Sequence, residues 1–475
     1  MRSSTKIIFN KIIIFGIFTT KNIFIREISC LFLLQTGFFG VDNYIKTMFE
    51  CWTIIKKINF SPVHGVSGVF TVKKCKISVV GCALADYLYT NIDFSAPDFQ
   101  KYASKTAGDG GITPGKLVFA SDLANFAKQP ITEILNEITH GAEPKAFNLG
   151  GPAIVAAVNA AQLLYGKAAE FDYYGAFGND ESADKLLALL RRLPVNLDNL
   201  QRKEGISPFT YVLSDAKYHN HKGERAFVNN VGTAELYSVN DIPEKFFNCD
   251  IAFYSATALV PAIHDNLRQL LARSKANGAL NVVATVFDFR NEKRNPDAPW
   301  PLGDSVGSYP LIDLLLMDYD EASRLSGQDN FDAVCNFFIN SGVGAFVITH
   351  GAHEFFVWSG GKLFQPISLR PLPVCAAVDL ELERHPELRG DTTGCGDNFA
   401  GGFLGSLVDQ LLSGKQPGEF DLYEASAWGS ASGGFACFCI GGTYFEGKSG
   451  EKQSKVMPFV AAYRRQLSEI PEKMN

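Results

Sequence analysis

The sequence lacks the patterns by which cysteine and histidine commonly hold zinc. Its ten cysteines and eight histidines include no CxxC motif and no histidine pair at a zinc spacing. We therefore expect no zinc site and no disulfide framework. Reduced, mostly buried thiols are typical of a reducing compartment, so the cysteine usage predicts a cytoplasmic protein.

Blocks of like charge suited to nucleic acid are also missing, and the aromatic residues are spread along the chain. A sequence without such blocks does not form an extended basic surface, so we expect no nucleic acid partner. The hydrophobic fraction of 46% and the charged fraction of 20% are those of an ordinary globular protein.

Long apolar runs are absent too, even in the basic and apolar segment 1–75. The stretch Ile12–Thr20 is bounded by Lys11 and Lys21, whereas a spanning helix needs about 20 apolar residues. We expect no membrane span. A secretory signal or a basic transit peptide stays open for this segment, although no A-x-A-like cleavage site follows. A start site assigned too far upstream, or a disordered extension, explains the composition of segment 1–75 better.

From residue 76 onward, apolar strands alternate with helices. We expect strands over 76–83, 171–176, 251–255, 281–288, 312–317, 345–349 and 354–358, and helices over 121–138, 153–164, 182–192, 262–277, 395–412 and 423–440. This alternation predicts an α/β domain over 76–475: a three-layer, doubly wound, mostly parallel sheet. Strands near 86–94, 116–120 and 209–231 do not fit that layout and predict a small β lid.

The segment 390–403 (GDTTGCGDNFAGGF) contains the candidate catalytic residues. Gly394, Cys395 and Gly396 precede a helix with an apolar face, so their N–H groups can point at an anion and form an anion hole at the positive end of the helix dipole. Asp397 then falls in the first turn, where a carboxylate can accept a proton from an attacking hydroxyl. An ordinary capped helix explains the local pattern equally well.

The whole string resembles the C-terminal signature of the ribokinase-like (PfkB) carbohydrate kinase family, roughly D-T-x-G-A-G-D-x-F-x-x-G, with Cys395 in place of alanine. The resemblance extends from Lys76 to about Ile470. It implies a ribokinase-like fold, ATP and Mg²⁺ as cosubstrate and cofactor, and phosphorylation of a hydroxyl on a sugar or sugar acid. It also implies that Asp397 is the catalytic base.

Further segments are similar to the substrate and nucleotide motifs of that family. KISVVGCALAD ends in Asp86, and GGPAIVAAVNAA begins with Gly150 and Gly151; the resemblance implies that these three residues bind substrate. THGAHE stands in the place of the nucleotide loop, which implies ATP contacts for Thr349 and Gly351.

Gly434 interrupts the predicted helix over 423–440. It permits close approach of adenine, with helix–helix contact as the competing reason.

Two sets of residues are candidates for metal binding. DYDE stands where the family has N-x-x-E, which implies that Glu321, with Asp318, organises the water shell of Mg²⁺. Asp391 and Thr393 match positions that support a monovalent cation such as K⁺ in relatives. Hydrogen bonding within the loop explains Asp391 and Thr393 somewhat better.

The substrate end departs from the family pattern, because Val155 stands where many members have asparagine. Arg290, after a predicted strand, is a candidate to bind a carboxylate or phosphate of the substrate, and a surface ion pair is equally expected. Glu224 and Arg225 follow a predicted hairpin of the lid, where they contact either substrate or only solvent.

A sugar-like molecule and ATP are the expected partners. A nucleoside kinase of the same fold is the nearest alternative, and a non-catalytic sugar-binding protein is a third. A homodimer through the lid is compatible with the sequence, as is a monomer with a covered lid edge.

Overall fold

The structure is a computed structural model that describes residues 74–469, apart from 107, 219–222 and 305. The predicted extension over 1–75 therefore lies outside the described residues, except for its last two. Among the helices of the described ranges, none is both long enough and apolar enough to cross a bilayer.

Nine strands form the main sheet, in the order β14-β13-β12-β11-β10-β9-β1-β5-β6. Neighbours from β12 to β6 are parallel, and β13 and β14 add an antiparallel edge. The strands are β1 (Cys75–Gly81), β5 (Ala169–Phe177), β6 (Asn196–Arg202), β9 (Ile251–Ser255), β10 (Leu280–Ala284), β11 (Leu314–Asp318), β12 (Ala345–Thr349), β13 (Phe355–Ser359) and β14 (Ile367–Leu372).

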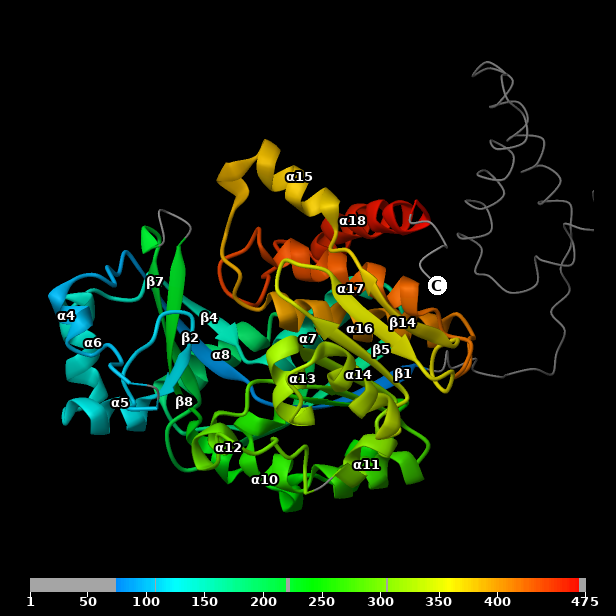
Figure 1. Cartoon of the computed structure of the whole chain (residues 1–475), viewed down its shortest axis with the longest axis horizontal. Coiled ribbons are helices and arrows are strands. Elements are labelled where there is room, and N and C mark those ends of the chain that lie inside the picture. The colour runs from blue at the N-terminus through cyan, green and yellow to red at the C-terminus, as the bar shows by residue number, and fades with distance from the viewer. Residues whose placement is uncertain (1–73, 107, 219–222, 305, 470–475) are drawn as a thin grey trace, which may run out of the picture. The chain divides into compact units, whose positions relative to one another are not determined.

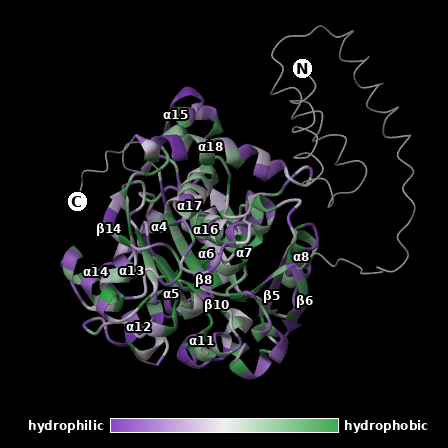
Figure 2. Cartoon of the chain, turned by 90° about the vertical axis from the view of Figure 1, so that its right-hand side faces the viewer, coloured by the Kyte–Doolittle hydropathy of each residue, from purple (hydrophilic) through white to green (hydrophobic). Residues whose placement is uncertain are grey.

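Helices cover both faces of this sheet, so its central strands are continuous runs of buried apolar residues. Within β1, Ile77 and Val79 face one apolar core and Val80 the other, and all three are fully buried. Figure 1 shows α16, α17 and α18 on one side of the sheet and α10 and α11 on the other. In Figure 2 the hydrophobic colouring is concentrated between these layers. The three-layer α/β fold is confirmed.

One face of the main sheet carries α7 (Pro152–Leu163), α8 (Glu181–Leu190), α15 (Ala376–Arg384), α16 (Cys395–Leu412), α17 (Leu422–Ala436) and α18 (Glu451–Ser468). The other carries α10 (Pro261–Asp265), α11 (Leu267–Ala276), α13 (Tyr319–Ser326) and α14 (Phe331–Asn340). The short helix α12 (Phe289–Arg294) follows β10.

A second sheet of five strands, in the order β3-β8-β7-β2-β4, stands beside the main one (Figure 1). Its strands are β2 (Leu84–Thr90), β3 (Leu117–Phe119), β4 (Ala146–Gly150), β7 (Phe209–Asp215) and β8 (Glu224–Asn230). The helices α4 (Pro97–Gln100), α5 (Ala120–Ala127) and α6 (Ile131–Thr139) pack on one of its faces in a separate apolar cluster.

The helical stretch expected over 121–138 is observed as two helices. It is divided into α5 and α6 because Lys128 adopts a left-handed conformation and Pro130 begins a new helix as its N-cap.

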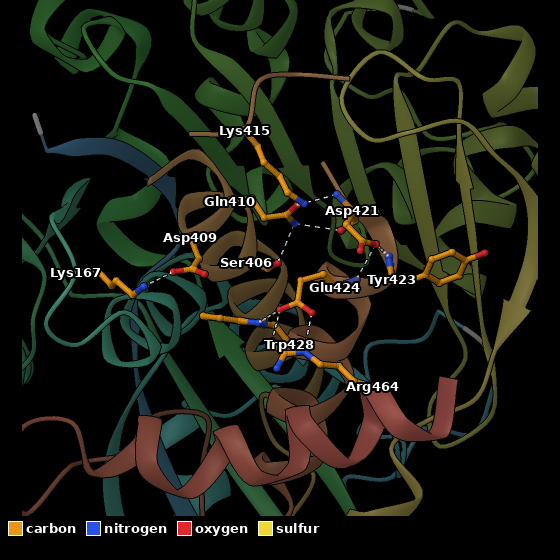
Figure 3. Close-up of polar contacts among 10 residues, drawn as sticks. All are labelled: Lys167, Ser406, Asp409, Gln410, Lys415, Asp421, Tyr423, Glu424, Trp428 and Arg464. Atoms are coloured by element: carbon orange, nitrogen blue, oxygen red, sulfur yellow. Dashed lines mark hydrogen bonds and ion pairs between the residues drawn. The ribbon is translucent and has the colours of Figure 1, made fainter. Parts of the chain in front are cut away.

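Polar contacts fasten the far half of α16 to its neighbours (Figure 3). The Gln410 amide donates to the Asp421 carbonyl (3.1 Å) and accepts from the Asp421 N–H (2.7 Å), which ties α16 to the start of α17. Glu424 of α17 pairs with Arg464 of α18 and accepts from the Trp428 indole at 2.8 Å. The helix that begins at the glycine turn is therefore held at its opposite end.

Candidate active site

The carboxyl ends of the parallel strands, where open α/β sheets bind ligands, bring several predicted site residues to one edge. Asp318 ends β11 and is the register partner of Thr349, which ends β12. Glu321 lies one turn into α13, directly after β11. Burial and the charge of Asp318 raise the pKa of Glu321, and the charge of Asp397 adds to this rise, so the start of α16 faces this edge as well.

Helix α16 begins in a tight glycine turn. Gly394 is its N-cap with φ of 76°, and a Cβ built there would lie 2.5 Å from the Cα of Gly442, so a side chain would not fit. A Cβ built on Gly396 meets no atom of the described residues within 4 Å. The first-turn N–H groups of α16 therefore adjoin open space at Gly396, as an anion hole requires.

Asp397 occupies the first turn of this helix and is half-buried. Surrounding protein removes much of its hydration and raises its pKa from the ordinary 3.8 to about 7. A carboxylate with this pKa is poised to exchange a proton near neutral pH.

Asp86 projects from β2 toward the same place. It is buried, and desolvation, followed by the charges of Asp397 and Asp391, raises its pKa to about 8. A Cβ built on Gly150 would lie 2.0 Å from Asp86 Oδ2, so the absence of a side chain at Gly150 makes room for this carboxylate. Gly151, with φ of 99°, turns the chain into α7 against the backbone of Ala83.

Glu321 and Asp318 form a capping box at the start of α13. Asp318 Oδ1 accepts from the Glu321 N–H at 2.8 Å, and Glu321 Oε2 accepts from the Asp318 N–H at 3.1 Å and from the Thr285 hydroxyl at 2.6 Å. Burial, followed by the charge of Asp318, raises the pKa of Glu321. Among the hydrogen bonds of the described residues, none involves Glu321 Oε1.

The predicted nucleotide loop follows β12. The Thr349 hydroxyl makes a long contact of 3.5 Å with the Met317 carbonyl. Gly351 has φ of 59°, and no atom in the described part of the chain lies within 4 Å of a Cβ built there, so this turn is open on its outer side. Gly434, in contrast, packs against α15, since a Cβ built there would lie 2.8 Å from Val378. This contact favours helix packing over adenine as the reason for that glycine.

Asp391 and Thr393 are engaged within the loop. The Asp391 carboxylate accepts from the Thr393 N–H at 2.8 Å and lies 3.3 Å from the Gly441 N–H. The Thr393 hydroxyl accepts from Arg225. These contacts match the loop hydrogen bonding expected as the alternative to a cation site.

Arg225 makes a contact that the sequence did not predict. It lies in β8 of the second sheet, and its guanidinium donates to the hydroxyls of Thr392 and Thr393 in the glycine-turn loop. The second sheet thus brings a fixed positive charge to the start of α16. The sequence signal was limited to a charged residue after a hairpin.

The side chain of Arg290 does not join the other predicted site residues. Its guanidinium forms a two-pronged ion pair with Asp265 of α10, with one hydrogen bond of 2.9 Å. The alternative of an ion pair is therefore the one observed, because Asp265 supplies the carboxylate from within the chain.

One face of the second sheet carries a polar row next to Asp86. Cross-strand pairing aligns Asn148, Asp86, Thr210 and Asn229 in neighbouring strands. The Asn229 amide donates to the Thr210 hydroxyl at 2.9 Å, and its Oδ1 atom is buried without a hydrogen-bond partner among the described residues. Sequence reasoning missed this row because it arises only when four strands are in register.

The pfkB family carbohydrate kinase model matches residues 118–446. The chain belongs to this family. It is therefore a phosphotransferase of the carbohydrate kinase type, and the resemblance read from the glycine-turn motif is confirmed.

Solved structures of the family share the ribokinase-like fold. An adenosine kinase from Sinorhizobium meliloti is 17% identical, with a TM-score of 0.57, over 83% of this chain and 100% of that one. A candidate sugar kinase from Rhizobium etli is also 17% identical, with a TM-score of 0.55, over 81% and 99%. A candidate ribokinase II from Escherichia coli, in complex with ATP and Mg²⁺, is 14% identical, with a TM-score of 0.53, over 82% and 99%. At these identities the likeness concerns the fold alone.

Proposed function

We propose that this kinase transfers the γ-phosphoryl group of ATP to a hydroxyl of a sugar or sugar acid, with Asp397 as the general base. The observation that carries the proposal is a carboxylate with a pKa raised to about 7 in the first turn of a helix whose N-terminus adjoins open space. The carboxylate takes the proton of the attacking hydroxyl, and the N–H groups of Gly394, Cys395 and Gly396 stabilise the charge on the transferring group.

ATP and Mg²⁺ fit the neighbouring groups. Glu321 offers Oε1 while its other oxygen is fixed by two donors, and Asp318 adds a second carboxylate at the same strand end. Carboxylate oxygens suit Mg²⁺, which keeps several of its waters. Thr349 and Gly351 would then contact the nucleotide from the end of β12. The ion supplies charge neutralisation at the phosphates.

Asp391 and Thr393 offer less to a monovalent cation. The Asp391 carboxylate and the Thr393 hydroxyl already hold hydrogen bonds to Gly441, Thr393 and Arg225. We therefore propose no K⁺ requirement, and an activity titration with KCl against choline chloride tests this directly.

The substrate side favours several hydroxyl groups. Asp86 binds one hydroxyl and, with a pKa of about 8, can be protonated at neutral pH and so both donate and accept. The Oδ1 atom of Asn229, on the same face, has no hydrogen-bond partner among the described residues and is a candidate acceptor for a further hydroxyl. Buried polar atoms of this kind discriminate strongly against ligands that leave them unpaired.

Arg225 adds a positive charge beside the position proposed for the transferring phosphoryl group. Its hydrogen bonds to Thr392 and Thr393 hold the guanidinium beside the proposed anion hole. From this position it can neutralise charge on the transferring phosphoryl group when the second sheet covers the substrate.

An adenosine-type nucleoside kinase is the second candidate, and a specific observation favours it. Phe119 of β3 and Phe289 of α12 form an aromatic pair at 5.9 Å, and Phe119 is the register partner of Asn229. An aromatic group at the end of the polar row can receive a base. A screen of ATP consumption with sugars, sugar acids and nucleosides separates the two functions. Turnover with nucleosides alone would replace the first proposal with the second, and turnover with neither class would refute both.

A further inference from the structure

Two free thiols meet at the glycine turn that begins α16. Cys395 is the first residue of that helix, and Cys437 is the C-cap of α17. Their Sγ atoms lie 3.5 Å apart, although 42 positions separate them in the chain, and both residues are partly exposed. This distance is close to van der Waals contact between two sulfur atoms.

The backbone fixes this approach. The Gly390 N–H donates to the Cys437 carbonyl at 2.8 Å, and the Asp391 N–H donates to the Cys439 carbonyl at 2.8 Å. A Cβ on Gly390 would overlap the Cys439 carbonyl oxygen at 1.9 Å. The glycine-turn loop and the segment after α17 therefore lie backbone to backbone. Bringing the two sulfurs to a disulfide length requires them to approach by about 1.5 Å.

We propose that Cys395 and Cys437 form a reversible disulfide that switches the kinase off under peroxide. The contact with the Cys395 thiol and the nearby Arg389 lower the pKa of Cys437, which favours its thiolate. Among the described residues, the Cys439 thiol, two positions away, makes no such contact with a sulfur atom and donates weakly to the Phe435 carbonyl at 3.9 Å.

The oxidation balances with a peroxide as the only added reactant. The Cys437 sulfur attacks one peroxide oxygen, the O–O bond breaks, and Cys437 becomes a sulfenic acid while one water leaves. The Cys395 sulfur then attacks the Cys437 sulfur, forms the S–S bond and releases a second water. Two thiols lose two electrons, and the peroxide gains them. A thiol reductant reverses the step.

The effect on activity rests on the proposed function, because Cys395 contributes one N–H group to the anion hole. Drawing its side chain toward α17 displaces that N–H group, and a displacement of about 1 Å can lower the rate about 100-fold.

Hydrogen peroxide treatment of the full chain, followed by tryptic mass spectrometry without reduction, tests the bond itself. Trypsin places Cys395 in the peptide 390–415 and Cys437 in the peptide 416–448. We expect these two peptides to be cross-linked in the parent and in Cys439→Ser, and separate in Cys437→Ser. No cross-link in the parent, or an equal cross-link in Cys437→Ser, would overturn the proposal.

Kinase activity is measured on the same samples. We expect about a 100-fold loss in the parent and in Cys439→Ser, recovered with dithiothreitol, and no comparable loss in Cys437→Ser. A complete cross-link with unchanged activity would refute the switch. Since the cross-link is read without any substrate, failure of the proposed function remains distinguishable from failure of the disulfide.

Discussion

Replacing Gly150 with alanine would push a methyl group into the carboxylate of Asp86. The new Cβ would lie 2.0 Å from Asp86 Oδ2, where ordinary contacts begin at 3.4 Å, so the carboxylate must move by about 1.4 Å. Asp86 is buried, and crowding of this kind costs about 1–3 kcal/mol of unfolding free energy. A shift of about 1 Å in a substrate-positioning group can cost about 100-fold in rate.

We therefore expect Gly150→Ala to lower kcat/KM about 100-fold for the substrate identified by screening, while ATP binding stays close to that of the parent. Steady-state kinetics measure the first quantity, and calorimetric titration with ATP measures the second. Gly447→Ala is the matched control: it lies in an exposed loop, and its nearest neighbour would be the end of the Glu451 side chain.

A double-mutant cycle tests whether Gly150→Ala lowers kcat/KM by displacing Asp86. With Asp86→Ala already in place the methyl group meets no carboxylate, so adding Gly150→Ala should change kcat/KM little further. Independent, additive losses in the double variant would refute the reasoning, as would parent-like kinetics in Gly150→Ala alone.

Three further predictions concern charge at the same site. Arg225→Met should lower kcat by about 10³-fold or more if its guanidinium neutralises the phosphoryl group, and Arg225→Lys should recover part of it; equal rates in both would contradict this role. Because the pKa values of Asp397 and Asp86 are raised to about 7 and 8, the stability that they contribute is present below pH 4 and is lost as the pH rises through 7–8. The unfolding temperature of the ligand-free protein should therefore fall between pH 5 and 7, and less so in Asp397→Asn. Lys452, buried with its Nζ atom 2.8 Å from Asn398 Oδ1, orients the residue after Asp397, so Lys452→Met should lower kcat roughly tenfold while the exposed Lys455→Met does not.

Much of the main sheet was predictable, because parallel strands buried on both faces are continuous apolar runs that a sequence displays directly. The start of β1 and the glycine turn before α16 are such local patterns. The strand β4 was not predicted because its five residues, from Ala146 to Gly150, carry no apolar run and pair with β2 at the edge of the second sheet. Residues 121–138 read as one helix because the break at Lys128 depends on a backbone conformation rather than on the apolar pattern.

The residues of the candidate active site also divide into those that the sequence predicts and those that it does not. The carboxylate and glycines of the 390–397 segment follow from local chemistry, since a helix start alone creates an anion site. The contact between Arg225 and Thr393 spans 168 positions and exists only once two sheets are placed together. The partner of Arg290 likewise depended on where α10 would lie. Long-range contacts of this kind have no counterpart in spacing or periodicity.

The most direct test of the account compares Asp397→Asn with Asp409→Asn. Both residues belong to α16, but Asp409 lies near its far end in an ion pair with Lys167. With the screened substrate and saturating ATP, we expect Asp397→Asn to lose about 10²–10⁴-fold in kcat while its affinity for ATP stays within about threefold of the parent. Asp409→Asn should keep parent-like turnover. Near-normal turnover in Asp397→Asn would contradict the assignment of Asp397 as the catalytic base.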